Sequence, residues 1–198
     1  MWQEALEVMS GVLNHSSKQL SESLSLIANK RIKISIGEIN TRPYCEPVES
    51  MEASDSENFV AQQFTGDFDG ILTLQMGNVE CVRLLSYCLG RSVSLDSFSE
   101  KEHEAILELG NVILNAVFRS MLNITQAHLT VERPKYYSSL FWMNETVGKN
   151  IYASNFITIS MEYLCLNSMF SDDRNGTMKV SLQMKNKEDI WRVLQRMV

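Results

Sequence analysis

The chain of 198 residues has a hydrophobic content of 44% and a formal net charge of −6. This length and content are enough to fill the core of one domain. Basic residues are scattered along an acidic chain, which excludes nucleic acid as an expected partner. No run of about 18 uncharged apolar residues occurs, and the acidic N-terminus lacks the features of a signal peptide. We therefore expect a cytoplasmic protein without membrane insertion.

The first part of the sequence predicts a long helix followed by strands. Apolar residues recur at helical spacing over about 2–28, and the stretch 31–39 alternates as a half-buried strand does. Two strand-like stretches, 59–64 and 71–76, flank a turn rich in Gly and Asp and predict a hairpin. A helix over 79–89 is expected to follow.

The segment from about 40 to 58 separates the first strand from this hairpin. It holds two of the three prolines and an acidic, Ser-rich run. Such a composition has too few apolar groups to pack, so a mobile loop is predicted.

A capping box marks the start of the central helix, because Ser99 and Glu102 have the required spacing. Periodic apolar residues continue that helix to about Leu122. The later elements predicted are strands around 126–131, 156–166 and 178–184 and a final helix that opens at Asn186.

The element order helix, strand, hairpin, helix occurs twice, in pseudo-repeats of about 1–92 and 97–198. The third strand-like stretch of each repeat ends alike, in Leu-Gln-Met76 and Leu-Gln-Met184. Neither repeat has enough apolar residues for an independent core. We therefore expect a single α/β domain over residues 1–198, in which both repeats share a continuous sheet.

Cysteine and histidine spacing gives no sign of a metal site. The four cysteines form no Cys-x-x-Cys pair, and the three histidines lie at no metal-ligand spacing. Cys81 and Cys88 share one face of the expected helix over 79–89 and are interpreted as small buried apolar side chains.

A polar strip runs along the central helix and covers about 80° of a helical wheel. The strip is compatible with an ordinary solvated face. However, asparagine is a weak helix former where Lys, Glu or Gln would stabilise better. Leu107, Leu114 and Phe118 run beside the strip and are compatible with a docking surface. The strip consists of Glu104, Glu108, Asn111, Asn115 and Arg119.

Three residues of this region match the signature of a known family. The signature reads Asp or Ser, three residues, Glu, two residues, Asn, twenty-two residues and Pro, and Glu108, Asn111 and Pro134 occupy its last three positions. The string Glu-Leu-Gly-Asn-Val from Glu108 also resembles the family's Glu-Ile-Gly-Asn-Ile. Glu104 departs from the pattern, since Asp or Ser is usual there. On these residues the chain resembles the CheC, CheX and FliY phosphatases of chemotaxis response regulators over nearly its whole length.

The resemblance implies a CheC-like pseudo-two-fold fold, in which two long helices pack on a mainly antiparallel sheet. It implies that Asn111 enters the active site of a phosphorylated CheY-like regulator and orients the attacking water, and that Glu108 pairs with the regulator's lysine. Glu104, Asn115 and Pro134 would support docking, together with the apolar residues beside the strip. Mg²⁺ would belong to the regulator, so no cofactor of the chain's own is expected. A CheD-like adaptor and a homodimer stay open as further partners.

The first helix resembles a second, degenerate site of the same family. Related proteins often carry two pseudo-symmetric sites, but here Glu7 is followed by Ser10 where asparagine is usual. Gly11 and Asn14 keep the pattern. A hydroxyl reaches less far than an amide and offers one donor instead of two, so a single working site is predicted.

A non-catalytic module on the same fold is the alternative function, either regulator-binding or flagellar-switch-like, because a fold does not fix function. Intact Glu108, Asn111 and Pro134 favour catalysis, whereas the loss of the asparagine at position 10 indicates that the activity can decay. An unrelated metal-dependent hydrolase would need clustered His and carboxylate ligands, which the sequence does not offer.

Overall fold

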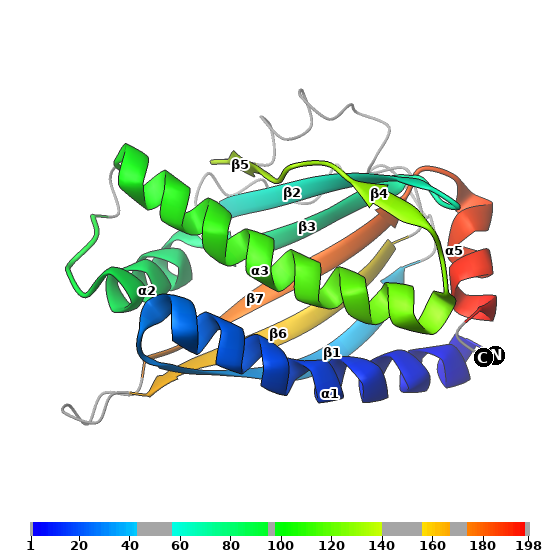
Figure 1. Ribbon diagram of the computed structural model, residues 1–198, viewed down its shortest axis with the longest axis horizontal. Helices are drawn as coiled ribbons and strands as arrows, with labels where there is room; N and C mark the ends of the chain where they lie inside the picture. The colour runs from blue at the N-terminus through cyan, green and yellow to red at the C-terminus, as the bar shows by residue number, and fades with distance from the viewer. Residues whose placement is uncertain (1, 43–56, 95–97, 140–155, 167–173, 197–198) are drawn as a thin grey trace.

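The computed structural model describes residues 2–42, 57–94, 98–139, 156–166 and 174–196. Its helices are α1 (Trp2–Ala28), α2 (Asn78–Leu89), α3 (Glu100–Thr125) and α5 (Lys187–Gln195). Its strands are β1 (Arg31–Arg42), β2 (Glu57–Gly66), β3 (Gly70–Gly77), β4 (Leu129–Val131), β5 (Lys135–Tyr137), β6 (Phe156–Leu166) and β7 (Arg174–Met184). The long helices α1 and α3 lie side by side on one face of the sheet and run in opposite directions (Figure 1).

All seven strands belong to one antiparallel sheet with the order β1-β6-β7-β3-β2-β4, and β5 also pairs with β2. The two halves of the chain exchange their outer strands, because β1 pairs with β6 while β4 and β5 pair with β2. At the centre β3 pairs with β7, and Thr73 lies opposite Ser181. The continuous, mainly antiparallel sheet with two long helices is therefore confirmed.

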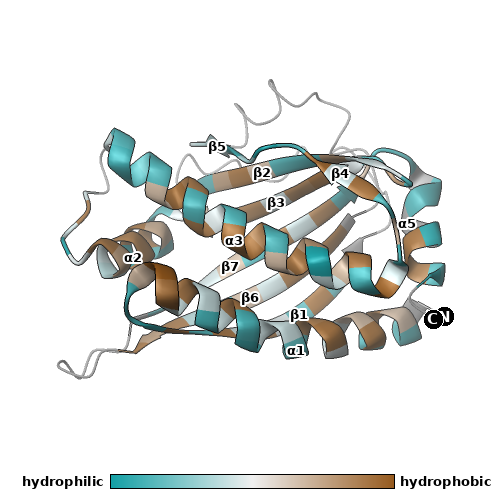
Figure 2. Cartoon of the chain, viewed as in Figure 1, coloured by the Kyte–Doolittle hydropathy of each residue, from teal (hydrophilic) through white to brown (hydrophobic). Residues whose placement is uncertain are grey.

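Alternate residues of the central strands form the core face beneath the helices. Leu72, Leu182 and Ile157 lie in one row across β3, β7 and β6, and none is more than 1% exposed. Ile113 and Leu114 of α3 have no exposed surface and belong to the same core cluster. Figure 2 shows the hydrophobic segments of the strands under α1 and α3. Burial of these side chains is the main favourable contribution to folding.

The capping box predicted for α3 is present. Glu102 accepts from the backbone N–H of Ser99 at 2.6 Å, and it also pairs with Arg91 at 2.8 Å. The hydrogen bonds from Ser99, and then the Arg91 guanidinium, hold the pKa of the Glu102 carboxyl below its usual value. The helix ends at Thr125, beyond the predicted end at Leu122, because Gln126 takes the left-handed conformation with φ 53° and closes the last turn.

The loop predicted for residues 40–58 is shorter than the sequence indicated. β1 continues to Arg42 because Asn40 still pairs with Thr158 of β6, and β2 begins at Glu57 opposite Gly77. Residues 43–56 lie outside the described part of the chain, so the prediction that they are mobile stays a prediction.

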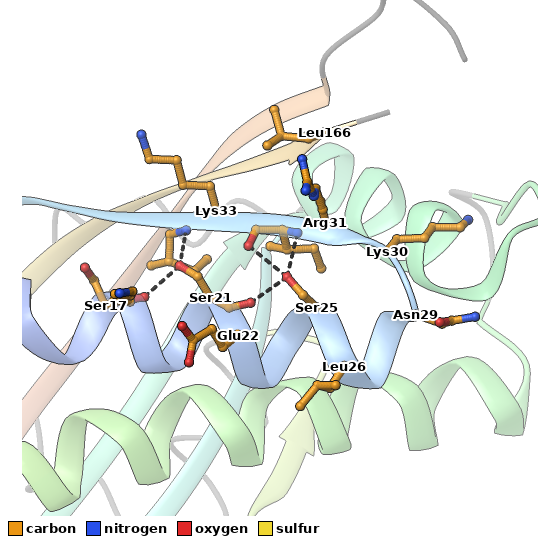
Figure 3. A pocket seen from close by; sticks show the side chains of 13 residues that line it. Ser17, Ser21, Glu22, Ser25, Leu26, Asn29, Lys30, Arg31, Lys33 and Leu166 are labelled. Atoms are coloured by element: carbon orange, nitrogen blue, oxygen red, sulfur yellow. Dashed lines mark hydrogen bonds between the residues drawn. The ribbon is translucent and has the colours of Figure 1, made fainter. Parts of the chain in front are cut away.

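Near its start, at residues 32–34, the outer edge of β1 is covered by serines of α1 (Figure 3). The backbone N–H groups of Ile32 and Ile34 donate to Ser25 Oγ at 2.9 Å and to Ser21 Oγ at 2.8 Å. At the opposite edge, β4 and β5 have only three residues each. Covered or very short edge strands resist pairing with a second chain. A homodimer formed by adding a strand at residues 32–34 would first have to break the serine bonds.

By length and composition, α3 is apolar enough to cross a membrane. Its apolar residues have a different explanation, because Ile106, Leu109, Ile113 and Val117 are buried in the core of the protein. A helix in a protein core meets the same criterion. Packing against the sheet therefore accounts for the hydropathy of this helix.

Candidate functional site

The polar strip of α3 faces outward as its spacing predicts. Glu104 and Glu108 are exposed, and Asn111 and Asn115 are half-buried. On the opposite side of the helix, Ile106, Ile113 and Val117 are no more than 2% exposed. The helix thus carries two carboxylates and two amides on one accessible face, supported from below by the core.

Gly110 brings α3 very close to the sheet directly before Asn111. A Cβ atom at position 110 would lie 2.7 Å from Val60 Cγ2 and 2.8 Å from its Cβ and Cγ1 atoms. Such distances are shorter than real Cβ contacts, so only glycine fits while Val60 of β2 keeps its place. The glycine in the Glu-Leu-Gly-Asn string therefore fixes the height and rotation of the helix at the asparagine.

Asn111 and Asn115 form a hydrogen-bonded amide pair. Asn115 Nδ2 donates to Asn111 Oδ1 at 2.7 Å, across one turn of the helix. This bond was not anticipated from the sequence, although the spacing of four residues between two asparagines was the signal that could have found it. The pair restricts how the Asn111 amide can turn.

Two of the three apolar residues interpreted as a docking surface are part of the core. Leu114 is 0% exposed and Phe118 is 3% exposed, and the Phe118 ring packs on Phe64 of β2 with 5.4 Å between centroids. Leu107 is half-buried and packs against the same core. The docking interpretation is therefore wrong for Leu114 and Phe118, since α3 is covered by its neighbours on more of its circumference than the wheel indicated.

Pro134 lies half-buried in the segment between β4 and β5. His103 of α3 packs on the Tyr136 ring with 4.9 Å between centroids. The Tyr136 hydroxyl donates to Asn58 Oδ1 at 2.6 Å, and burial raises the pKa of Tyr136 to about 12. His103, Tyr136 and Asn58 were not singled out from the sequence, because only the fold brings them together.

The degenerate site on α1 keeps part of this geometry. Glu7 is exposed and Ser10 is half-buried, and Asn14 Nδ2 donates to Ser10 Oγ at 3.3 Å. The position that corresponds to Gly110 holds Met9, which is fully buried. Because α1 and α3 run in opposite directions, the start of α1, which carries Glu7 and Ser10, lies at the opposite end of the helical layer from the start of α3 (Figure 1).

A groove of about 980 Å³ lies between the C-terminal half of α1 and the start of β1 (Figure 3). Its walls include Lys18, Lys30 and the serines that bind the edge of β1. No residue of the α3 strip lines it. Among the described residues, no group of three or more His, Cys, Asp or Glu side chains could hold a metal ion.

Comparison with known proteins gives a likeness of fold. No protein-family model and no curated protein sequence matches the chain. FliY from Thermotoga maritima superposes with a TM-score of 0.71 at 13% identity, covering 98% of both chains. The FliG–FliM complex from H. pylori gives 0.70 at 13% identity, covering 98% of this chain and 100% of the matched one. CheX from Desulfovibrio desulfuricans gives 0.52 at 14% identity, covering 88% of this chain and 99% of the other.

The chain therefore has the α/β fold shared by FliY, FliM and the CheX chemotaxis proteins. This is the fold that the resemblance at Glu108, Asn111 and Pro134 implied. At these low identities the likeness concerns the fold alone, and the residues of the α3 strip have to carry any argument about chemistry.

Proposed function

We propose that the chain is a cytoplasmic CheC-type phosphatase that accelerates hydrolysis of the aspartyl phosphate on a CheY-like chemotaxis response regulator. Asn111 orients the attacking water, and Glu108 binds a lysine of the regulator. The observation that carries this proposal is the presentation of both side chains on the accessible face of one helix, with Glu108 exposed and Asn111 half-buried.

The support for Asn111 favours a role that depends on position. Gly110 keeps the helix against Val60, and Asn115 binds the Asn111 amide. A side chain presented from a supported helix is held more accurately than one on a loop. Misplacement by about 1 Å commonly lowers a rate about a hundredfold, so a catalytic amide benefits from this arrangement.

The reaction needs little from the phosphatase except positioning. Water attacks phosphorus while the bond between phosphorus and the aspartate oxygen breaks, which releases inorganic phosphate and restores the carboxylate; both protons of the water leave with the phosphate. Asn111 Oδ1 can accept from the water, and Nδ2 can donate to a phosphoryl oxygen. Mg²⁺ and the phosphorylated aspartate come from the regulator, so the chain supplies no nucleophile or metal ligand.

Glu108 contributes to docking in this proposal. Its carboxylate lies one turn before Asn111 on the same face and is exposed in the free protein. Pairing with a lysine at a forming interface orients the two proteins and accelerates their encounter. A CheD-like adaptor and a homodimer are further partners that this function would accommodate.

A binding module without catalysis is the second candidate function. The fold likeness to FliM in its complex with FliG favours it, as does the serine at position 10. In that case the acidic residues Glu104 and Glu108 dock a partner, and the amide of Asn111 has no chemical role.

Single-turnover phosphate release from phosphorylated CheY-like regulators tests the proposal. Wild-type protein is expected to accelerate release, and Asn111→Ala to lose about a hundredfold of the acceleration while regulator affinity survives. Glu108→Ala is expected to weaken affinity and turnover together. Ser10→Ala is the matched control on α1 and is expected to change neither. Equal rates for wild type and Asn111→Ala, with binding retained, would leave the binding module as the function.

A further inference from the structure

The amide pair on α3 supports an inference that rests on the proposed phosphatase function. Asn115 Nδ2 donates to Asn111 Oδ1 at 2.7 Å. We infer that Asn115 is a positioning residue: it selects one of the two orientations of the Asn111 amide, the one in which Nδ2 is left to donate to the phosphoryl group. Asn115 itself needs no contact with the regulator's phosphate.

The helix backbone under the amide pair is held by packing, so the conformation of the Asn111 side chain is the main thing that can still vary. The contact between Gly110 and Val60 fixes α3 on β2, and Ile113 and Leu114, which lie between the two asparagines, are fully buried. The Cα positions of both asparagines are therefore held by the core. What is not fixed by packing is the terminal torsion of a half-buried amide.

The χ2 torsion of asparagine, which turns the amide, has a broad and approximately two-fold distribution. Turning the Asn111 amide by half a turn exchanges the positions of Oδ1 and Nδ2. With the Asn115 amide oriented as observed, only one orientation of Asn111 gives Asn115 Nδ2 an acceptor, since turning the Asn111 amide alone would set two NH₂ groups against each other. In the observed orientation, the Nδ2 hydrogens of Asn111 lie outside this bond, and Oδ1 keeps a second lone pair with which to accept from water.

The first helix provides an internal comparison. Asn14 occupies the same place relative to Ser10 and donates to its Oγ at 3.3 Å, a longer bond that lies beyond the usual N–H···O range. The Ser10 hydroxyl has one oxygen that can both donate and accept, and its hydrogen rotates to suit the partner. A neighbouring asparagine therefore has no orientation of this group to select. The same asparagine neighbour is thus present on α1, but the amide that it would orient is absent.

Three substitutions at position 115 separate orientation from other effects. Asn115→Ala removes the donor. Asn115→Asp keeps the size but can only accept, so it favours the reversed Asn111 amide. Asn115→Gln retains an NH₂ donor at a spacing that allows side-chain bonds on helices. Asn14→Ala on α1 is the matched control.

Single-turnover phosphate release is measured over a range of phosphatase concentrations, which separates the maximal rate from the concentration that gives half of it. We expect Asn115→Ala to lower the maximal rate about fivefold to tenfold, the effect of about one hydrogen bond, without changing the half-saturating concentration more than about twofold. Asn115→Asp should lose at least as much of the maximal rate, Asn115→Gln should recover most of it, and Asn14→Ala should lose none. Maximal rates for the Ala and Asp variants equal to that of the wild type would overturn the inference.

A second readout is independent of activity. In ¹⁵N NMR relaxation, the order parameter of the Asn111 side-chain amide should fall in Asn115→Ala and stay high in Asn115→Asp, where the reversed amide is held instead. An unchanged order parameter in Asn115→Ala overturns the orienting contact. A wild type that fails to accelerate phosphate release refutes the proposed function, and the order parameter then decides by itself whether Asn115 orients Asn111.

Discussion

Substituting Gly110 by alanine is expected to destabilise the protein, although alanine is the better helix former. The new Cβ would lie 2.7–2.8 Å from three atoms of Val60, where carbon atoms in contact are normally about 3.5–4.0 Å apart. Val60 is 1% exposed and cannot move toward solvent. Overpacking of this kind typically lowers the free energy of unfolding by about 1–3 kcal/mol. The higher helix propensity of alanine raises it by about 1 kcal/mol. The expected net loss is therefore up to about 2 kcal/mol, or a Tm lower by up to roughly 8 °C.

Gly11→Ala is the matched control for this prediction, because Gly11 is an exposed glycine inside α1 and, apart from its chain neighbours and the adjacent backbone of its own helix, no atom lies within 4 Å of the position its Cβ would take. That variant should gain up to about 1 kcal/mol. Thermal and urea unfolding followed by circular dichroism measure both. A Gly110→Ala protein as stable as the Gly11→Ala protein would refute the close contact between α3 and β2. Adding Val60→Ala to Gly110→Ala should cost less than the sum of the single changes.

Three further outcomes are expected. Replacing Ser21 and Ser25 together by alanine should lower the free energy of unfolding by about 1–3 kcal/mol for each unpaired N–H, and sedimentation velocity should show more dimer through the uncovered β1 edge. The pKa of Glu102 is lower in the folded than in the unfolded state, so its charge stabilises the protein above its ordinary pKa and this stability is lost as the pH falls. Glu102→Gln should therefore flatten the decrease of Tm between about pH 5 and 3. Ser10→Asn should raise maximal phosphate release by up to about twofold, because Asn14 is already placed to bind the new amide; no increase would mean that α1 cannot form a site.

Most helices and strands followed closely from periodicity, although β5 (Lys135–Tyr137) was not predicted and β7 begins at Arg174 rather than at residue 178. The bounds of α1 and β6 agree with the predicted ranges, and the capping box placed the start of α3. These features depend on residues only a few positions apart in the chain, so they can be read from the sequence alone. The exchange of outer strands between the halves could not be predicted in the same way. It depends on which of several similar strands pair, and pairing partners such as Ile34 and Tyr163 are far apart in the chain.

The helical wheel identified the accessible face of α3 but not its width. Leu114 and Phe118 stand beside the strip on the wheel, yet both are buried. The reason is that α3 is flanked by α1 on one side and by β5 on the other, so the covered part of its surface extends to the margin of the strip. Only the arrangement of neighbouring elements determines how much of a helix is covered.

The contacts that support Asn111 could not be predicted in full from residue spacing. The string Glu-Leu-Gly-Asn-Val shows a glycine, but its partner Val60 is in another strand. The bond from Asn115 lies within reach of sequence reasoning, since residues four apart on a helix are neighbours. The sequence did not contain the direction of that bond, which decides whether Oδ1 or Nδ2 of Asn111 is engaged with Asn115.

The difference between α1 and α3 bears on the choice between the two candidate functions. A surface that only docks a partner tolerates mobile side chains, because exposed charges attract over several ångströms and need no single geometry. Hydrolysis by an oriented water does need one. On α3 the amide is present together with the close contact at Gly110 and the bond from Asn115. On α1 the amide is replaced by Ser10, the position of Gly110 is taken by Met9, and the bond from Asn14 is longer. The amide and its supporting contacts thus occur together on one helix and are both reduced on the other, which is the pattern that the proposed single-site phosphatase requires and that an acidic docking strip gives no reason to expect.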